Sequence, residues 1–125
     1  MLRFAFNPLA EVNAAVVDFE LAPRDESGRV LASADVSLVV PDDPARGNGP
    51  LLFDVPNRGC SITSRSLNEA GLAAFYDLLA PGDGLTFRRG FALASVAWQS
   101  DVDPIPGALS SSLPSAGSDA APVTG

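Results

Sequence analysis

The sequence predicts an α/β fold in which a β-hairpin is followed by a parallel βαβ unit. Three observations support this prediction. Apolar and polar residues alternate through residues 30–40, continuous apolar runs occupy residues 51–55 and 91–98, and a helical pattern separates these two runs. Since the chain has 125 residues, it offers room for one domain of ordinary size.

The predicted hairpin begins with a strand at residues 15–22, where every second residue from Val17 to Leu21 is apolar and the residues between are acidic. Residues 23–28 combine Pro, Asp, Ser and Gly, which favour a turn. The returning strand at residues 30–40 shows the clearest alternation in the chain, which is typical of a strand with one face exposed to water.

The βαβ unit is predicted to follow a Pro- and Gly-rich surface loop at residues 41–50. The apolar run at 51–55 is typical of a strand covered on both faces. A helix is predicted from Ser66, because Ser66 and Glu69 have the spacing of a capping box. Its apolar face consists of Leu72, Phe75, Tyr76 and Leu79. A second strand at 91–98 completes a unit whose two strands lie parallel and adjacent.

The composition excludes several classes of function. The chain has no His, so it cannot supply the imidazole of a Ser-His-Asp triad or a histidine ligand for a metal. Its net charge of −7 repels a phosphate backbone, which argues against binding to nucleic acid. The single Cys60 has no second thiol for a disulfide or a zinc site. We therefore predict no metal and no cofactor.

The same composition bears on localisation. Pro8 and Glu11 interrupt the apolar N-terminal stretch, which does not have the pattern of a signal peptide. No window of the sequence has the length and apolar character of a membrane-spanning helix. We therefore expect a soluble protein that does not associate with membranes, with the cytoplasm as its default location.

The candidate site lies after the strand at 51–55. In open parallel sheets ligands bind beyond the carboxyl ends of the strands, where this sequence places Asn57, Arg58, Gly59 and Cys60. Trp98 and Gln99 follow the second parallel strand, so they are expected at the same edge and are candidates to line a cleft. The alternative interpretation is a structural turn in which Arg58 pairs with Asp54.

The loop offers no obvious nucleophile. Ser61, Ser64 and Ser66 have no neighbouring base, and the chain contains no GxSxG elbow. Cys60 precedes a predicted helix, but without His or a second Cys its default interpretation is a small unreactive apolar residue.

Several motifs resemble one family of proteins. The segments AP, SAD, DPARGNG, LLFDVPNRG, RRGFALASVAWQ and PVTG, which are distributed between residues 22 and 125, resemble the N-terminal part of large bacterial α/β-hydrolase domain-containing proteins. This resemblance implies that residues 1–103 are the N-terminal part of an α/β-hydrolase domain and that residues 104–125 are a Pro-, Ser- and Gly-rich loop or tail. It also implies serine-dependent hydrolysis of a small ester or similar acyl compound by the full-length protein.

The resemblance further implies a role for the candidate site. In α/β-hydrolases the loop after the third strand supplies a backbone N–H to the oxyanion, so Gly59 and Cys60 become candidate donors, supported by Asn57 and Arg58. The elbow serine, the acid and the His lie beyond this chain in the family's order. The chain is therefore expected to be an inactive fragment whose partner is the remainder of the hydrolase domain.

The resemblance also implies an incomplete sheet. The strand at 51–55 would lose one neighbour and present an apolar edge, which predicts poor solubility or self-association. The alternative to a hydrolase fragment is a small non-catalytic binding or structural α/β module.

Overall fold

The computed structural model describes residues 1–72, 77, 80–103, 105–115, 117–118 and 121–122. These residues have the mixed α/β structure that the sequence predicts. The strands form two three-stranded sheets, of order β1-β2-β6 and β3-β5-β4, and one two-stranded pair, β7-β8. The chain divides into two compact units, the first containing residues 1–33 and 112–125 and the second containing residues 34–111. The domain boundary predicted after residue 103 stays a prediction.

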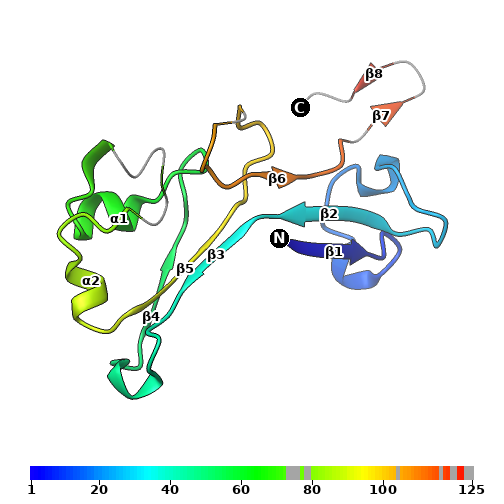
Figure 1. Ribbon diagram of the computed structural model, residues 1–125. Helices are drawn as coiled ribbons and strands as arrows, with labels where there is room; N and C mark the ends of the chain where they lie inside the picture. Colours follow the sequence, from blue (N-terminus) through cyan, green and yellow to red (C-terminus); the bar gives the residue numbers. More distant parts are fainter. Residues whose placement is uncertain (73–76, 78–79, 104, 116, 119–120, 123–125) are drawn as a thin grey trace. The chain divides into compact units, whose positions relative to one another are not determined.

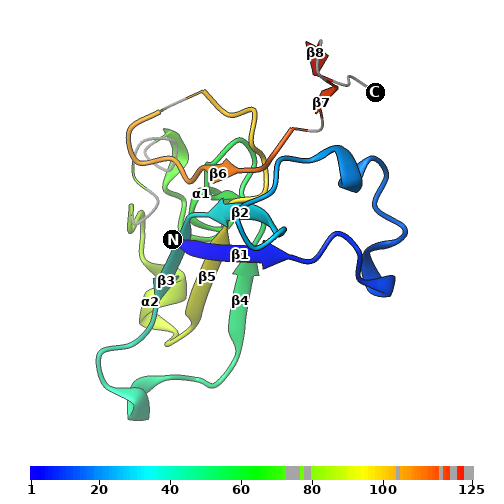
Figure 2. The same cartoon turned by 90° about the vertical axis from the view of Figure 1, so that its right-hand side faces the viewer.

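The second unit contains the parallel strand pair. In Figures 1 and 2, β5 (Ala92–Val96) lies between β3 (Val36–Val39) and β4 (Leu51–Asp54). β4 pairs with β5 in parallel, and β3 pairs with β5 in antiparallel orientation. The predicted parallel pairing of the two apolar runs is therefore confirmed.

The predicted strand at 30–40 is divided at Asp35 into β2 (Val30–Ala34) and β3. The Asp35 backbone N–H donates to the Ser110 carbonyl at 2.9 Å, and its carbonyl accepts from the Ala97 N–H at 2.9 Å. The Asp35 carboxylate also accepts from the backbone N–H and the hydroxyl of Ser110. The predicted segment does form strand structure, but these contacts of Asp35 divide it into two strands.

The helix predicted from Ser66 is wrong at its start. Helix α1 spans Ile62–Leu67, and its N-cap is Ser61, whose hydroxyl accepts from the Ser64 N–H at 3.0 Å. Ser66 lies inside this helix, and the φ of +51° at Glu69 is incompatible with a continuing helix. Part of the predicted apolar face, Phe75, Tyr76 and Leu79, falls outside the described residues. A second short helix, α2 (Leu85–Arg88), precedes β5 in a segment for which no helix was predicted.

The described core of the second unit is small. Ala34, Ala97 and Leu109 are buried in one cluster against which Val96 packs. α1 and α2 lie on one side of the β3-β5-β4 sheet (Figure 1). Phe53 is 61% exposed and Leu51 is 55% exposed, so the prediction that β4 is covered on both faces is wrong. The side chains of β4 alternate between faces, and the two helices cover only the face that carries Leu52 and Asp54.

β4 is an outer strand of its sheet, as the incomplete-sheet hypothesis requires. We predict that the protein self-associates through this edge, because exposed Phe53 and Leu51 flank unpaired backbone groups. Sedimentation should show an oligomer that Phe53→Lys dissociates, while Leu31→Lys, at another exposed strand position, should leave it intact. A proven monomer with slow hydrogen exchange at every amide of residues 51–55 would contradict the prediction, since β5 protects only alternate amides of β4.

The first unit contains β1 (Leu2–Phe6), most of β2 and two 3₁₀ turns, Glu11–Asn13 and Phe19–Leu21. The strand predicted at 15–22 is wrong. Asp18 adopts a left-handed conformation with φ +56°, and the Phe19 ring packs edge-on against Phe6 with ring centroids 6.1 Å apart. The aromatic contact thus takes the place of strand pairing, and β2 has β1 as its neighbour.

The turn predicted at 23–28 is confirmed. The Asp25 carboxylate accepts from the backbone N–H groups of Ser27 and Arg29, each at 2.9 Å. These bonds, with Arg29 as the main contributor and the Ser27 hydroxyl next, lower the pKa of Asp25. Gly28, with φ +77°, supplies the left-handed position of the turn.

None of the helices in the described parts of the chain has the length and apolar composition that a membrane span requires.

Candidate functional site

The predicted site is a tight turn between β4 and α1. The backbone N–H of Asn57 donates to the Cys60 carbonyl at 3.1 Å, and the N–H of Cys60 donates to the Asn57 carbonyl at 3.0 Å. The two residues between them have positive φ, +49° at Arg58 and +80° at Gly59. Positive φ at both central positions is typical of a type I′ turn, and it is costly at a residue other than Gly.

Contacts with the loop after β5 hold Arg58 in this conformation. Its backbone N–H donates to the Gln99 Oε1 at 2.6 Å. Its guanidinium donates to the Asp101 carbonyl at 3.1 Å and lies 3.6 Å from the Asp101 carboxylate. The alternative interpretation, a structural turn with an Arg–Asp pair, agrees with these contacts except in the partner, which is Asp101 and not Asp54. We call these contacts of Arg58 with Gln99 and Asp101 the Arg58 clamp.

The Asp54 carboxylate is instead turned toward the helix face of the sheet. It is 3% exposed, and its Oδ1 accepts from the Thr63 N–H at 3.2 Å and the Thr63 hydroxyl at 3.0 Å. Its Oδ2 accepts from the Ser95 hydroxyl at 3.2 Å. Asp54, at the end of β4, thus connects β4 with α1 and β5 just before the turn at residues 57–60.

Trp98 also connects the two loops. Its indole N–H donates to the Pro56 carbonyl at 2.8 Å, while its side chain keeps much of its surface exposed. Together with the bond from Arg58 to Gln99, this contact brings Trp98 and Gln99 to the edge that carries residues 57–60. The assignment of Trp98 and Gln99 to the lining of a cleft stays a prediction.

The turn has one unused donor. The N–H groups of Arg58 and Cys60 are both hydrogen bonded within the chain. Within the described part of the chain, the Gly59 N–H has no acceptor. The Gly59 carbonyl accepts from the Leu109 N–H at 3.0 Å. If the turn binds an anion, the donor is therefore Gly59 and not Cys60.

Comparisons with other proteins bear on the family resemblance. No protein-family model, curated protein or solved structure matches this chain. The α/β-hydrolase family therefore stays a prediction. Among the described residues, no group of three or more His, Cys, Asp or Glu residues could hold a metal ion.

Cys60 is buried, and burial raises the pKa of its thiol. Because a raised pKa lowers the thiolate fraction at any given pH, we predict that iodoacetamide at pH 8 alkylates folded Cys60 at least about tenfold more slowly than the urea-unfolded chain. Mass spectrometry would follow the reaction, with glutathione as a reactivity standard. Alkylation of the folded protein at the rate of the unfolded chain would identify Cys60 as an accessible, activated thiol.

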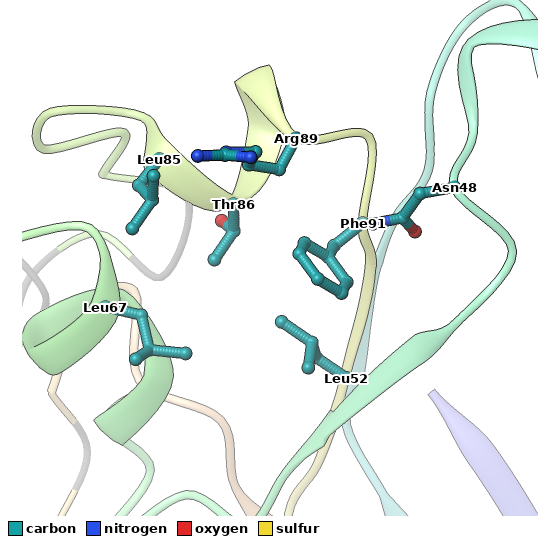
Figure 3. Close-up of a pocket in the computed structure, with 7 residues that line it drawn as sticks. All are labelled: Asn48, Leu52, Leu67, Leu85, Thr86, Arg89 and Phe91. Atoms are coloured by element: carbon teal, nitrogen blue, oxygen red, sulfur yellow. The ribbon is translucent and has the colours of Figure 1, made fainter.

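A second candidate site is an open hollow of about 580 Å³ between α1, α2 and β4, which we call the α2 pocket. Figure 3 shows its apolar side chains around the hollow, with Thr86 lying among them, and Arg89 and Asn48 toward its margin. Its lining consists of Leu52, Leu67, Leu85, Phe91, Thr86, Arg89 and Asn48. This site was not predicted from the sequence, because α2 itself was not predicted.

Hydrogen bonds hold residues that line the α2 pocket in place. Asn68 Oδ1 accepts from both the N–H and the hydroxyl of Thr86, each at 2.8 Å. The Asn48 N–H donates to the Gly90 carbonyl at 3.0 Å. Gly90 has φ +73°, and a Cβ there would lie 2.3 Å from the Arg46 carbonyl oxygen, so only Gly permits this close approach of the two loops.

Proposed function

We propose that this chain is the N-terminal portion of an α/β-hydrolase-like protein and that its turn at residues 57–60 supplies an oxyanion donor. The substrate would be a small ester or a similar acyl compound, and the remainder of the hydrolase domain would supply the nucleophile. The observation that supports the proposal is the Gly59 N–H, which has no acceptor among the described residues and is located at the carboxyl end of a parallel strand in a turn held by the Arg58 clamp.

The chemistry of this turn is electrostatic. When a nucleophile attacks an acyl carbon, the carbonyl oxygen becomes negatively charged, and a fixed N–H donor stabilises that charge in the transition state. The Arg58 clamp fixes the peptide plane between Asn57 and Arg58, which directly precedes the peptide that carries the Gly59 N–H, so it limits the movement of the donor during the reaction. The chain itself has no imidazole to take the proton of an attacking hydroxyl, so we expect it to be inactive alone.

The test begins with the DNA that follows the codon for Gly125. We expect it to encode, in frame or in the adjoining gene, a further strand and a GxSxG elbow. The combined protein should hydrolyse p-nitrophenyl esters, and the 125-residue chain should not. Turnover by this chain alone, or the absence of any elbow sequence, would refute the proposal.

A substitution tests the role of the turn within the active protein. Arg58→Ala should lower kcat about tenfold or more with little change in KM, because the donor is then less well fixed in the transition state. Arg88→Ala is the matched control, since Arg88 also forms an exposed ion pair, with Asp83 at 3.4 Å. Equal kcat for the two variants would exclude a role in catalysis for the contacts of the Arg58 guanidinium with Asp101.

The second candidate function is a small non-catalytic binding module. One observation favours it: Leu109 packs over Gly59, so the backbone on that side of the turn is already covered by the chain itself. A cooperatively folding monomer with no downstream hydrolase sequence would support this alternative.

A further inference from the structure

We propose that the α2 pocket binds an apolar monocarboxylate, whose tail lies between α1, α2 and β4 and whose carboxylate pairs with Arg89. None of residues 57–60 lines this pocket, so the proposal does not depend on the hydrolase assignment. Its volume of about 580 Å³ lies within the range of small-molecule sites.

The walls of the α2 pocket favour an apolar tail. Leu52 from β4, Leu67 from α1 and Leu85 from α2 point into the hollow in Figure 3, with the Phe91 ring beside Leu52. Leu67 and Leu85 remain 46% and 39% exposed. A ligand tail that covers these side chains removes apolar surface from water, which favours binding.

The charge at the margin favours an anionic head. Figure 3 shows the Arg89 guanidinium at the edge of the hollow, beside Leu85. Arg88, its neighbour in sequence, is paired with Asp83, whereas Arg89 has no acidic partner among the residues that the structure describes. An unpaired guanidinium beside an apolar hollow is complementary to a carboxylate, which it can bind through two parallel N–H donors.

The other polar groups at the margin do not favour a cation. The Thr86 hydroxyl donates to Asn68 Oδ1, and the Asn48 side chain is a neutral amide. The lining of the α2 pocket contains no acidic residue among those described. An alkylammonium ion would therefore meet the positive charge of Arg89 without a compensating carboxylate. The α2 pocket is thus expected to select ligands by the charge of the head group as well as by the apolar character of the tail.

Binding can be measured with octanoate, octanol and octylammonium, three probes that share a tail and differ in the head group. We expect octanoate to produce saturable NMR shifts of the Thr86 and Phe91 amides, and the two other probes to bind at least about tenfold more weakly. Equal affinity of octanol and octanoate, or failure of octanoate to saturate at millimolar concentration, would overturn the proposal.

Two variants assign the head-group contact. Arg89→Gln should weaken octanoate binding by about tenfold to a hundredfold and leave octanol binding unchanged. Arg88→Gln removes the same charge one residue away, but from a side chain outside the lining, so octanoate affinity should change by less than about threefold. Equal losses in the two variants would show general attraction to positive charge and would refute the proposed pairing. Heteronuclear NMR spectra of each free variant would show that the fold is retained.

Discussion

Replacement of Asp54 by Ala is expected to lower the free energy of unfolding by about 3 kcal/mol. The carboxylate is 3% exposed and accepts three hydrogen bonds, two from Thr63 and one from Ser95. Ser95 is also 3% exposed, so water cannot readily replace the lost acceptor. A buried donor without an acceptor costs about 1–3 kcal/mol, and Asp54→Ala removes the partner of several donors at once.

Urea unfolding followed by circular dichroism would measure this loss. Asp54→Asn should be intermediate, because the amide keeps one acceptor oxygen but directs an NH₂ group toward a donor. Asp42→Ala, in the exposed loop before β4, is the control and should change stability by less than about 0.5 kcal/mol. Equal stability of the Ala variants at positions 54 and 42 would show that the Asp54 bonds do not hold β4 to α1 and β5.

The sequence contained enough information to predict the parallel strand pair and the meeting of its two loops. Two apolar runs separated by a helical segment favour parallel pairing, and parallel strands end at the same edge of a sheet. This rule placed residues 57–60 beside Trp98 and Gln99, and the bonds to Pro56 and Arg58 join the two loops. The rule could not identify the partner of Arg58, because it does not show that the Asp54 carboxylate bonds to Thr63 and Ser95, which leaves Asp101 in the loop after β5 to pair with Arg58.

The failures have local causes. Ser61, and not Ser66, caps the helix. Ser61 directly follows the turn at residues 57–60 and is 2% exposed, so its buried hydroxyl needs a hydrogen-bond partner, which the Ser64 N–H supplies. The strand pattern at residues 15–22 was real, but the packing of Phe19 against Phe6 overrides it. The contact of Leu109 with Gly59 comes from a segment that has neither strand nor helix periodicity, so no pattern in the sequence predicts it.

Gly59→Ala is expected to destabilise the protein by about 3 kcal/mol through two separable effects. The first is conformational, because φ is +80° and Ala pays about 1–2 kcal/mol in the left-handed region. The second is steric, since a Cβ would lie 2.4 Å from the Leu109 carbonyl oxygen and 2.9 Å from the Ala108 Cβ. Relief of this overlap must displace Leu109, which donates to the Gly59 carbonyl and belongs to the buried cluster.

Gly49→Ala separates these two effects. Gly49 has φ +94°, and an added Cβ there would meet no atom within 4 Å, so it carries the conformational cost alone. Chemical denaturation of both variants should show a loss at position 59 that exceeds the loss at position 49 by at least about 1 kcal/mol. Equal losses would mean that the segment containing Leu109 moves away from the turn at little cost. In that case the contact of Leu109 with Gly59 would no longer support the alternative of a closed non-catalytic module.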